Sequence, residues 1–229
     1  MGQILENLLL AALCDSCEPQ IVATITSHPR FTDLIAIIEL DLMALKAKDP
    51  AAPANPNLIA LGYTSFKAVL HYRLAHWIAK TFAMEFDHRS EEIAMIISSR
   101  GKLQSGAEIH HRCEIGRRFV MDHGYGTVIG ETTSIGDDCY ILSGVILGAK
   151  GIACNPGGKR HPTIGHRVQI GAFASVLGPV SIGNDVYIGA HTQISESIPE
   201  HSVITMKSRI QVLKSRNLAS VSCEPTVLP

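Results

Sequence analysis

Residues 163–194 of this 229-residue chain read TIGHRVQIGAFASVLGPVSIGNDVYIGAHTQI. An aliphatic side chain occupies every sixth position of the stretch: Ile164, Ile170, Val176, Ile182, Ile188 and Ile194. The same spacing of six runs through two earlier stretches, whose members are Ile109, Ile115 and Met121, then Ile129, Ile135, Ile141 and Leu147. A period of six fits neither a helix nor a simple alternating strand, and an internal repeat of this kind predicts a β-solenoid.

Each six-residue unit, called a hexad below, is expected to form one short strand and one turn. The aliphatic side chain would point into a narrow core, and the glycine that often follows it would permit the turn. Three hexads would complete one coil, so the thirteen hexads predict just over four coils, with the repeat lost from Ser202 onward.

Composition limits the classes of function. The chain is 46% hydrophobic and 18% charged, which is typical of a globular protein. Its net charge of −1 and the absence of a Lys/Arg block argue against nucleic-acid binding. No apolar run is long enough to span a membrane, and the start of the chain lacks the features of a signal peptide, so we expect a cytoplasmic protein with reduced cysteines.

The first hundred residues follow a different pattern. Apolar residues at helical intervals predict helices over residues 31–48, 64–84 and 90–99, the last ending at Gly101. We therefore expect a helical N-terminal domain over residues 1–104, a solenoid over 105–204 and a C-terminal tail over 205–229. The helices are expected to serve in oligomerisation, because a short solenoid has exposed edges.

The hexads are interrupted twice. After Met121, two extra residues form a glycine-rich turn that begins with Asp122 and His123, and we expect both side chains to be exposed there. Histidine is well suited to act as a general base near neutral pH, although a solvated turn would explain the pair equally well.

The second interruption runs from Gly148 to Thr163 and ends in Lys159, Arg160 and His161. Long loops in a solenoid are usually functional or disordered. The basic end of this loop could bind an anion such as a substrate carboxylate, or it could be a solvated loop. A cleft that brings the two interruptions together could lie between coils or between neighbouring subunits.

Several motifs resemble those of the serine O-acetyltransferases, a branch of the left-handed β-helix acyltransferases. They run in the order of that family and cover roughly residues 45–205: Asp49-Pro50, Tyr72-Arg73, His76-Trp77, Ile109-His110, Met121-Asp122-His123, Gly130-Glu131-Thr132, Leu147-Gly148 and Arg160-His161-Pro162. The resemblance implies an α+β fold, with an N-terminal helical domain followed by a left-handed parallel β-helix. It also implies transfer of an acetyl group from acetyl-CoA to the hydroxyl of L-serine, in cysteine biosynthesis.

The resemblance also implies residue roles. His123 matches the catalytic base, and Glu108 stands where the family has an aspartate that orients the base. Asp49 and Asp122 match residues that hold the substrate ammonium, while Arg160 and His161 match those that hold its carboxylate. The positions that match the cofactor-binding residues are Ala149, Gly171, Ala172, Gly189, Ala190 and Arg209.

Further expectations concern partners. The resemblance implies a homotrimer or a dimer of trimers and no metal. The family docks on cysteine synthase through a C-terminal isoleucine, and this chain ends in Pro229, so that complex is not expected. His110, His111, His166, His191 and His201 are expected to be solvated.

Three alternatives remain open at this point. The acceptor could be another hydroxy amino acid such as homoserine, since Glu108, Tyr125 and the long loop are unusual. The solenoid could be a non-catalytic scaffold. A zinc site of the γ-carbonic anhydrase type would need three converging histidines, and that spacing is not evident.

Overall fold

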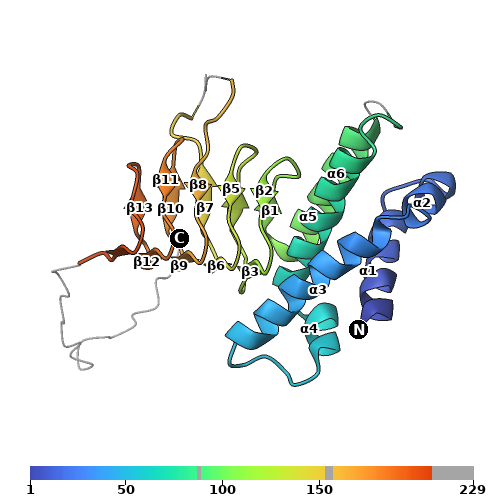
Figure 1. Ribbon diagram of the computed structural model, residues 1–229, viewed down its shortest axis with the longest axis horizontal. Helices are drawn as coiled ribbons and strands as arrows, with labels where there is room; N and C mark the ends of the chain where they lie inside the picture. The colour runs from blue at the N-terminus through green and yellow to red at the C-terminus, as the bar shows by residue number, and fades with distance from the viewer. Residues whose placement is uncertain (87–88, 153–156, 208–229) are drawn as a thin grey trace, which may run out of the picture.

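The computed structural model describes residues 1–86, 89–152 and 157–207. A group of helices lies at one end of a stack of short parallel strands (Figure 1). The helices are α1 (Gly2–Cys14), α2 (Pro19–Thr26), α3 (Phe31–Lys48), α4 (Pro56–Gly62), α5 (Thr64–Thr81) and α6 (Arg89–Ser105). No helix in the described part of the chain is both long and apolar enough to cross a membrane.

Helix α3 has the bounds that the sequence predicts, and α5 ends three residues earlier than predicted, at Thr81. The expectation that Gly101 ends the last helix is wrong, because α6 continues to Ser105. A Cβ atom at Gly101 would lie 2.7 Å from the Cβ of His71 on α5. The glycine is therefore needed for the close packing of α5 against α6 and not for a helix end.

The strands form three parallel sheets that share the hexad repeat. Sheet 1 has the order β1 (Glu108–Ile109), β4 (Val128–Ile129), β7 (Ile146–Gly148), β10 (Ser175–Leu177) and β13 (Gln193–Ile194). Sheet 2 has the order β2 (Glu114–Ile115), β5 (Ser134–Ile135), β8 (Thr163–Ile164) and β11 (Ser181–Ile182). Sheet 3 has the order β3 (Val120–Met121), β6 (Tyr140–Ile141), β9 (Gln169–Ile170), β12 (Tyr187–Ile188) and β14 (Val203–Ile204). Consecutive strands belong to different sheets, so the chain winds as a three-sided parallel β-helix.

The aliphatic position of each hexad points into the core, as predicted. Ile129, Leu147, Val176 and Ile188 have no exposed surface, and strands of successive coils pair at these positions. The repeat also continues further than predicted, because Val203 and Ile204 form β14 and pair with β12. The chain therefore keeps its coil beyond Ser202.

The role expected for the hexad glycines is only partly right. Gly136 does not adopt a positive φ angle, and the positive φ falls two residues later, at Asp138. A Cβ atom on Gly136 would lie 2.7 Å from the backbone oxygen of Gly165 in the next coil. Here glycine permits the close stacking of coils, while the following residues make the turn.

A buried ion pair joins the helical domain to the first coil. The Arg73 guanidinium on α5 donates to the Asp41 carboxylate on α3 at 2.8 Å, and also to the carbonyl oxygens of Ile115 and Gly116. Asp41 in turn accepts the backbone N–H of Phe119 at 2.9 Å. This joint fixes α3, and therefore its C-terminal end near Asp49, against the β-helix.

Candidate active site

Two corners of the β-helix carry the predicted site residues. The His123 corner consists of the segments that join sheet 3 to sheet 1, including residues 122–127 between β3 and β4. The Arg160 corner consists of the segments that join sheet 1 to sheet 2, including the long loop between β7 and β8 that ends at Pro162 (Figure 1). Within one chain, the two interruptions of the hexads therefore lie on different edges of the prism.

The His123 corner faces the helical domain across a cavity of about 360 Å³. Its lining includes Asp122 and His123 from the turn after β3, together with Asp49 and Tyr63 from the segments beside α4. The predicted base and both predicted ammonium-binding carboxylates thus line one cavity. They come from parts of the sequence more than 70 residues apart.

His123 and Asp122 differ in exposure. The side chain of His123 is 76% exposed, and its Nε2 atom lies 4.0 Å from Oδ2 of Asp122. The expectation that both side chains are exposed is wrong for Asp122, which is buried. His123 adopts a φ of 59° and Gly124 one of 70°, so two successive left-handed residues turn the imidazole outward while the aspartate stays inside.

Tyrosine hydroxyls hold both carboxylates. The Tyr140 hydroxyl on β6 donates to Oδ2 of Asp122 at 2.6 Å, and the Tyr63 hydroxyl donates to Oδ2 of Asp49 at 3.1 Å. Burial, followed by the hydrogen bond to Asp122, raises the pKa of the Tyr140 phenol, so the hydroxyl keeps its proton and remains a donor. Both contacts satisfy a carboxylate without cancelling its charge, which leaves the cavity suited to a cation.

Four of the predicted cofactor-binding residues follow His123 down the same corner. Backbone hydrogen bonds place Gly171 and Gly189 in successive coils below Leu142, and Ala172 and Ala190 come directly after these glycines. A Cβ atom on Gly171 would lie 2.5 Å from the backbone nitrogen of Ala190, so no larger residue fits there. The alanines therefore present only methyl groups at this corner, where the stacked rings of Phe173 and His191 also lie. Two further cofactor predictions lie elsewhere: Ala149 follows β7 on the Arg160 corner, and Arg209 falls outside the described residues.

The Arg160 corner holds its loop through Thr132. The Thr132 hydroxyl accepts the backbone N–H groups of Arg160 at 3.0 Å and His161 at 3.1 Å, and lies 2.8 Å from Nδ1 of His161. The backbone N–H of Thr132 donates to the same Nδ1 atom at 3.2 Å, so this nitrogen is an acceptor and His161 is neutral with its proton on Nε2. Burial, and then the Arg160 cation, lower the pKa of His161.

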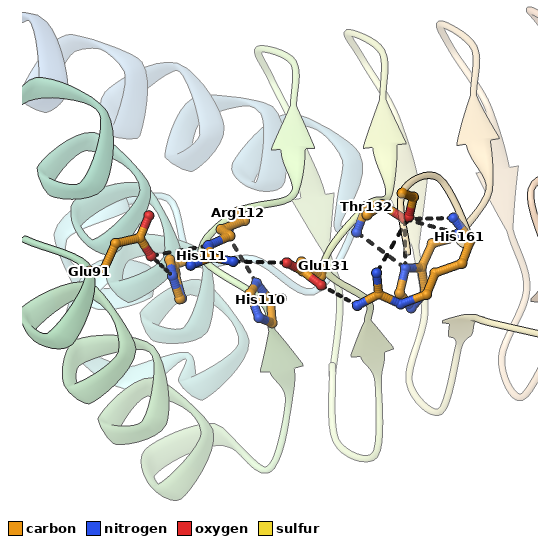
Figure 2. Close-up of polar contacts among 9 residues, drawn as sticks. Glu91, His110, His111, Arg112, Glu131, Thr132 and His161 are labelled. Atoms are coloured by element: carbon orange, nitrogen blue, oxygen red, sulfur yellow. Dashed lines mark hydrogen bonds and ion pairs between the residues drawn. The ribbon is translucent and has the colours of Figure 1, made fainter. Parts of the chain in front are cut away.

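Glu131 precedes Thr132 and binds the side chain of Arg160. Its Oε2 atom pairs with Nη2 of Arg160, and its Oε1 atom accepts Nη1 of Arg112 at 3.0 Å. The hydrogen bond from Arg160 is the main cause that lowers the pKa of Glu131, so this carboxylate stays ionised. Figure 2 shows the contacts that run from Glu91 on α6, through Arg112 and Glu131, to the Arg160 corner.

The side chain of Glu108 pairs with Lys102, whereas a residue that orients the base would contact His123. The Oε2 atom of Glu108 lies 2.5 Å from Nζ of Lys102 on α6, and the two side chains share a cavity with His110 and His111. In this structure Glu108 contacts Lys102 and not His123, so its role in orienting the base stays a prediction.

One of the other histidines departs from the expectation of solvation. His111 is 5% exposed, and its Nε2 atom lies 2.8 Å from Oε2 of Glu91 on α6. It therefore helps to join the helical domain to the first coil. Among the described residues, no three His, Cys, Asp or Glu side chains come together in a way that could hold a metal ion.

Residues that sequence reasoning did not assign to the site are Tyr63, Tyr140 and Arg112. Tyr140 occupies an ordinary outward position of a hexad, and Arg112 a surface turn, so neither carries a signal in the sequence. Glu131 and Thr132 belong to a motif that the sequence analysis quotes, but their contacts with Arg160 emerge only from the pairing of coils.

Comparison with known proteins identifies the family of this chain. A family model for the bacterial transferase hexapeptide (six repeats) matches residues 161–196. A serine acetyltransferase of Mycobacterium tuberculosis is 42% identical over 164 residues, which are 72% of this chain and 67% of that protein. One of Helicobacter pylori is also 42% identical, over 74% of this chain and 92% of that protein. This chain belongs to the serine acetyltransferase family.

A solved structure extends the likeness to three dimensions. The serine acetyltransferase of Neisseria gonorrhoeae, crystallised in complex with serine, has a TM-score of 0.72 and is 29% identical. The match covers 87% of this chain and 80% of that one. The predicted family, the acyltransferase class and the fold of a helical domain followed by a left-handed β-helix are confirmed. The individual residue roles stay predictions.

Proposed function

We propose that this chain transfers the acetyl group of acetyl-CoA to the hydroxyl of L-serine, and that the product, O-acetylserine, serves cysteine biosynthesis in the cytoplasm. The observation that carries the proposal is the His123 corner, where an exposed imidazole shares a cavity with two carboxylates. Membership of the family, and the serine bound by the Neisseria relative, support the same acceptor.

His123 acts as the general base. Its exposed imidazole accepts the proton of the serine hydroxyl as that oxygen attacks the thioester carbonyl carbon. As the carbon–sulfur bond breaks, the imidazolium returns the proton to the departing thiolate, which leaves as the free thiol. Acetyl-CoA, when bound, supplies the activated acyl group.

Asp49 and Asp122 bind the substrate ammonium. Both carboxylates line the cavity, each accepts from a tyrosine hydroxyl, and no Lys or Arg side chain of the described residues pairs with either. Their negative charge remains available, and an ammonium between them would place the serine side chain beside His123. Arg160 and His161 bind the carboxylate at the opposite end of the amino acid, with Arg160 offering a two-pronged donor.

The two binding halves lie on different corners of one chain, so we propose that each active site is shared by two copies. The His123 corner of one copy would face the Arg160 corner of its neighbour in a trimer with threefold symmetry. The helical domains would then be free to pair two trimers into a hexamer.

The small residues on the His123 corner fit a long, narrow acyl carrier. Ala172 and Ala190 add little bulk at this corner, while Gly171 lets its coil stack closely on the next one, because its Cβ would meet the backbone of Ala190. Ala149 would contribute from the neighbouring copy's Arg160 corner.

A panel of acceptors tests the proposal. The wild-type protein is incubated with acetyl-CoA and L-serine, L-homoserine or L-threonine, and the release of free CoA thiol is followed. The highest kcat/KM is expected with L-serine. A higher kcat/KM with L-homoserine would mean that L-homoserine, and not L-serine, is the acceptor. No release of CoA with any acceptor would overturn the proposal that the chain is an enzyme.

A further inference from the structure

In the part of the chain that the structure describes, the hydrogen bonds and ion pairs of one carboxylate beside Arg160 go to two cations. Glu131 accepts from Arg112 on one oxygen and pairs with Arg160 on the other. Both the Glu131 and Arg160 side chains are largely shielded, with 24% and 28% of their surfaces exposed. Partial shielding makes the pair stronger and better ordered than an ion pair on an open surface.

Two neighbouring residues, Glu131 and Thr132, contact different parts of the loop at this corner. Thr132 holds the loop itself, because its hydroxyl accepts the backbone N–H groups of Arg160 and His161, and its carbonyl accepts Nζ of Lys159 at 2.6 Å. Glu131 contacts the guanidinium of Arg160, and no hydrogen bond joins its side chain to the backbone of the loop residues that the structure describes. Loss of the Glu131 charge should therefore leave the loop in place while releasing Nη2 of Arg160, whose Nη1 atom also donates to the carbonyl oxygen of Gly158 at 3.4 Å.

Arg112 connects this carboxylate to the helical domain. Its Nε atom donates to Oε2 of Glu91 on α6 at 3.1 Å, while its Nη1 atom donates to Glu131. Figure 2 shows Arg112 between the two glutamates. Two guanidinium groups thus share Glu131, so Arg160 is not fully neutralised and keeps positive charge for an incoming carboxylate.

We propose that Glu131 is a positioning residue, which orients the Arg160 guanidinium toward the carboxylate of the acceptor amino acid, and that Arg112 supports it from the helical domain. The inference rests on the proposed function of Arg160 as a carboxylate ligand. It adds a determinant of acceptor binding that does not itself touch the acceptor.

Charge and position make opposite predictions for Glu131→Gln. Removal of a negative charge beside Arg160 strengthens the attraction for any carboxylate, so charge alone would lower the KM for L-serine. Loss of the fixed orientation would raise it. We expect the KM for L-serine to rise roughly tenfold, with the kcat and the KM for acetyl-CoA changed less than about twofold.

L-Serinamide separates positioning from a general structural defect. This acceptor has the serine hydroxyl and amine but no carboxylate, so Glu131→Gln should leave its KM near the wild-type value. Glu131→Asp, which keeps the charge, should recover part of the affinity for L-serine. A lowered or unchanged KM for L-serine, or an equal loss with L-serinamide, would overturn the inference.

Arg112 is tested by a double-mutant cycle. Arg112→Ala should raise the KM for L-serine about threefold in the wild-type background and have no further effect in Glu131→Gln, because Arg112 acts through Glu131. Arg117→Ala is the matched control: it removes an exposed arginine between β2 and β3, on the third corner, and should leave kinetics unchanged. Equal effects of Arg112→Ala in both backgrounds would contradict the coupling.

The wild-type measurement keeps the two proposals apart. If the wild-type protein releases no CoA with L-serine, the proposed function fails. If it is active and Glu131→Gln behaves as wild type, only the positioning role fails.

Discussion

The His123 corner and the Arg160 corner use the same coiled backbone for opposite tasks. At the His123 corner, two carboxylates are held by neutral hydroxyls, and the imidazole beside them is exposed. At the Arg160 corner, the cation is paired with Glu131, and the loop that carries it is pinned by Thr132. The first corner is suited to receive an ammonium and a proton, and the second to present a fixed cation.

The two corners also differ in the elements that support them. Asp49 reaches the first corner from the end of α3, which the Asp41–Arg73 pair holds against the first coil. The second corner is assembled mainly from the β-helix and is joined to α6 by the contacts of Arg112 and His111 with Glu91. The proposed binding of the amino acid would therefore depend on both domains.

Replacement of the base should produce the largest effect. In His123→Ala, proton transfer from the acceptor hydroxyl is lost, so kcat should fall about 10³-fold with L-serine while the KM values change little. Release of CoA thiol under saturating substrates measures this. His191→Ala, at an exposed histidine further down the same corner, serves as the control and should retain near wild-type kcat. Near-native turnover by a folded His123→Ala protein would refute the assignment of the base.

Arg160→Ala should weaken the other half of the site. Loss of a charge-assisted contact to the acceptor carboxylate should raise the KM for L-serine about thirtyfold, with a much smaller change in the KM for acetyl-CoA. An increase in both KM values to the same extent would point to a disordered loop rather than to a lost carboxylate contact.

A mixture of the two variants tests whether the corners meet between copies. In mixed trimers of His123→Ala and Arg160→Ala chains, a site that combines the intact corner of each would recover activity. Co-refolding equal amounts should restore about one quarter of wild-type sites, measured at low L-serine concentration. No recovery in trimers shown to be mixed would place both corners of a site on one chain.

The hexads predict this fold well because the aliphatic residue of each hexad is buried in the core of the β-helix. Ile129 or Ile188 can only be buried if the chain coils. The breaks in the repeat mark Asp122-His123 and Arg160-His161 as residues that do not follow the pattern. The relation between the breaks is harder to predict. It depends on which corner each interruption reaches, and this follows from the three sheets rather than from the spacing along the chain.

Side-chain partners were beyond prediction for a different reason. Tyr140 occupies an ordinary strand position, and only the stacking of β3 on β6 brings its hydroxyl to Asp122. The burial of Asp122 follows from the same contact. Gly101 resembled a helix end because local sequence does not report the close packing of α5 on α6.

Tyr140→Phe should have a moderate effect on the His123 corner. Without the phenol hydroxyl, the buried Asp122 carboxylate loses a donor and its fixed orientation, so the KM for L-serine should rise about fivefold. Tyr187→Phe is the matched control, because Tyr187 occupies the corresponding position of sheet 3, two coils further on. Equal effects of the two substitutions would remove Tyr140 from the site.

The smallest expected effect is a loss of stability on acidification through His161 at the Arg160 corner. Burial and Arg160 lower the pKa of His161, so the unfolded chain takes up this proton first as the pH falls below about 6.5, the ordinary value for histidine. The contribution of His161 to the free energy of unfolding is therefore fully present above that pH and declines as the pH falls toward the lowered value. A proton on Nδ1 would also remove the acceptor of the Thr132 backbone N–H and place two donors against each other. Chemical denaturation at pH 7.5 and 5.5 should show a smaller loss in His161→Gln than in wild type, and parallel losses would mean that His161 carries no such linkage.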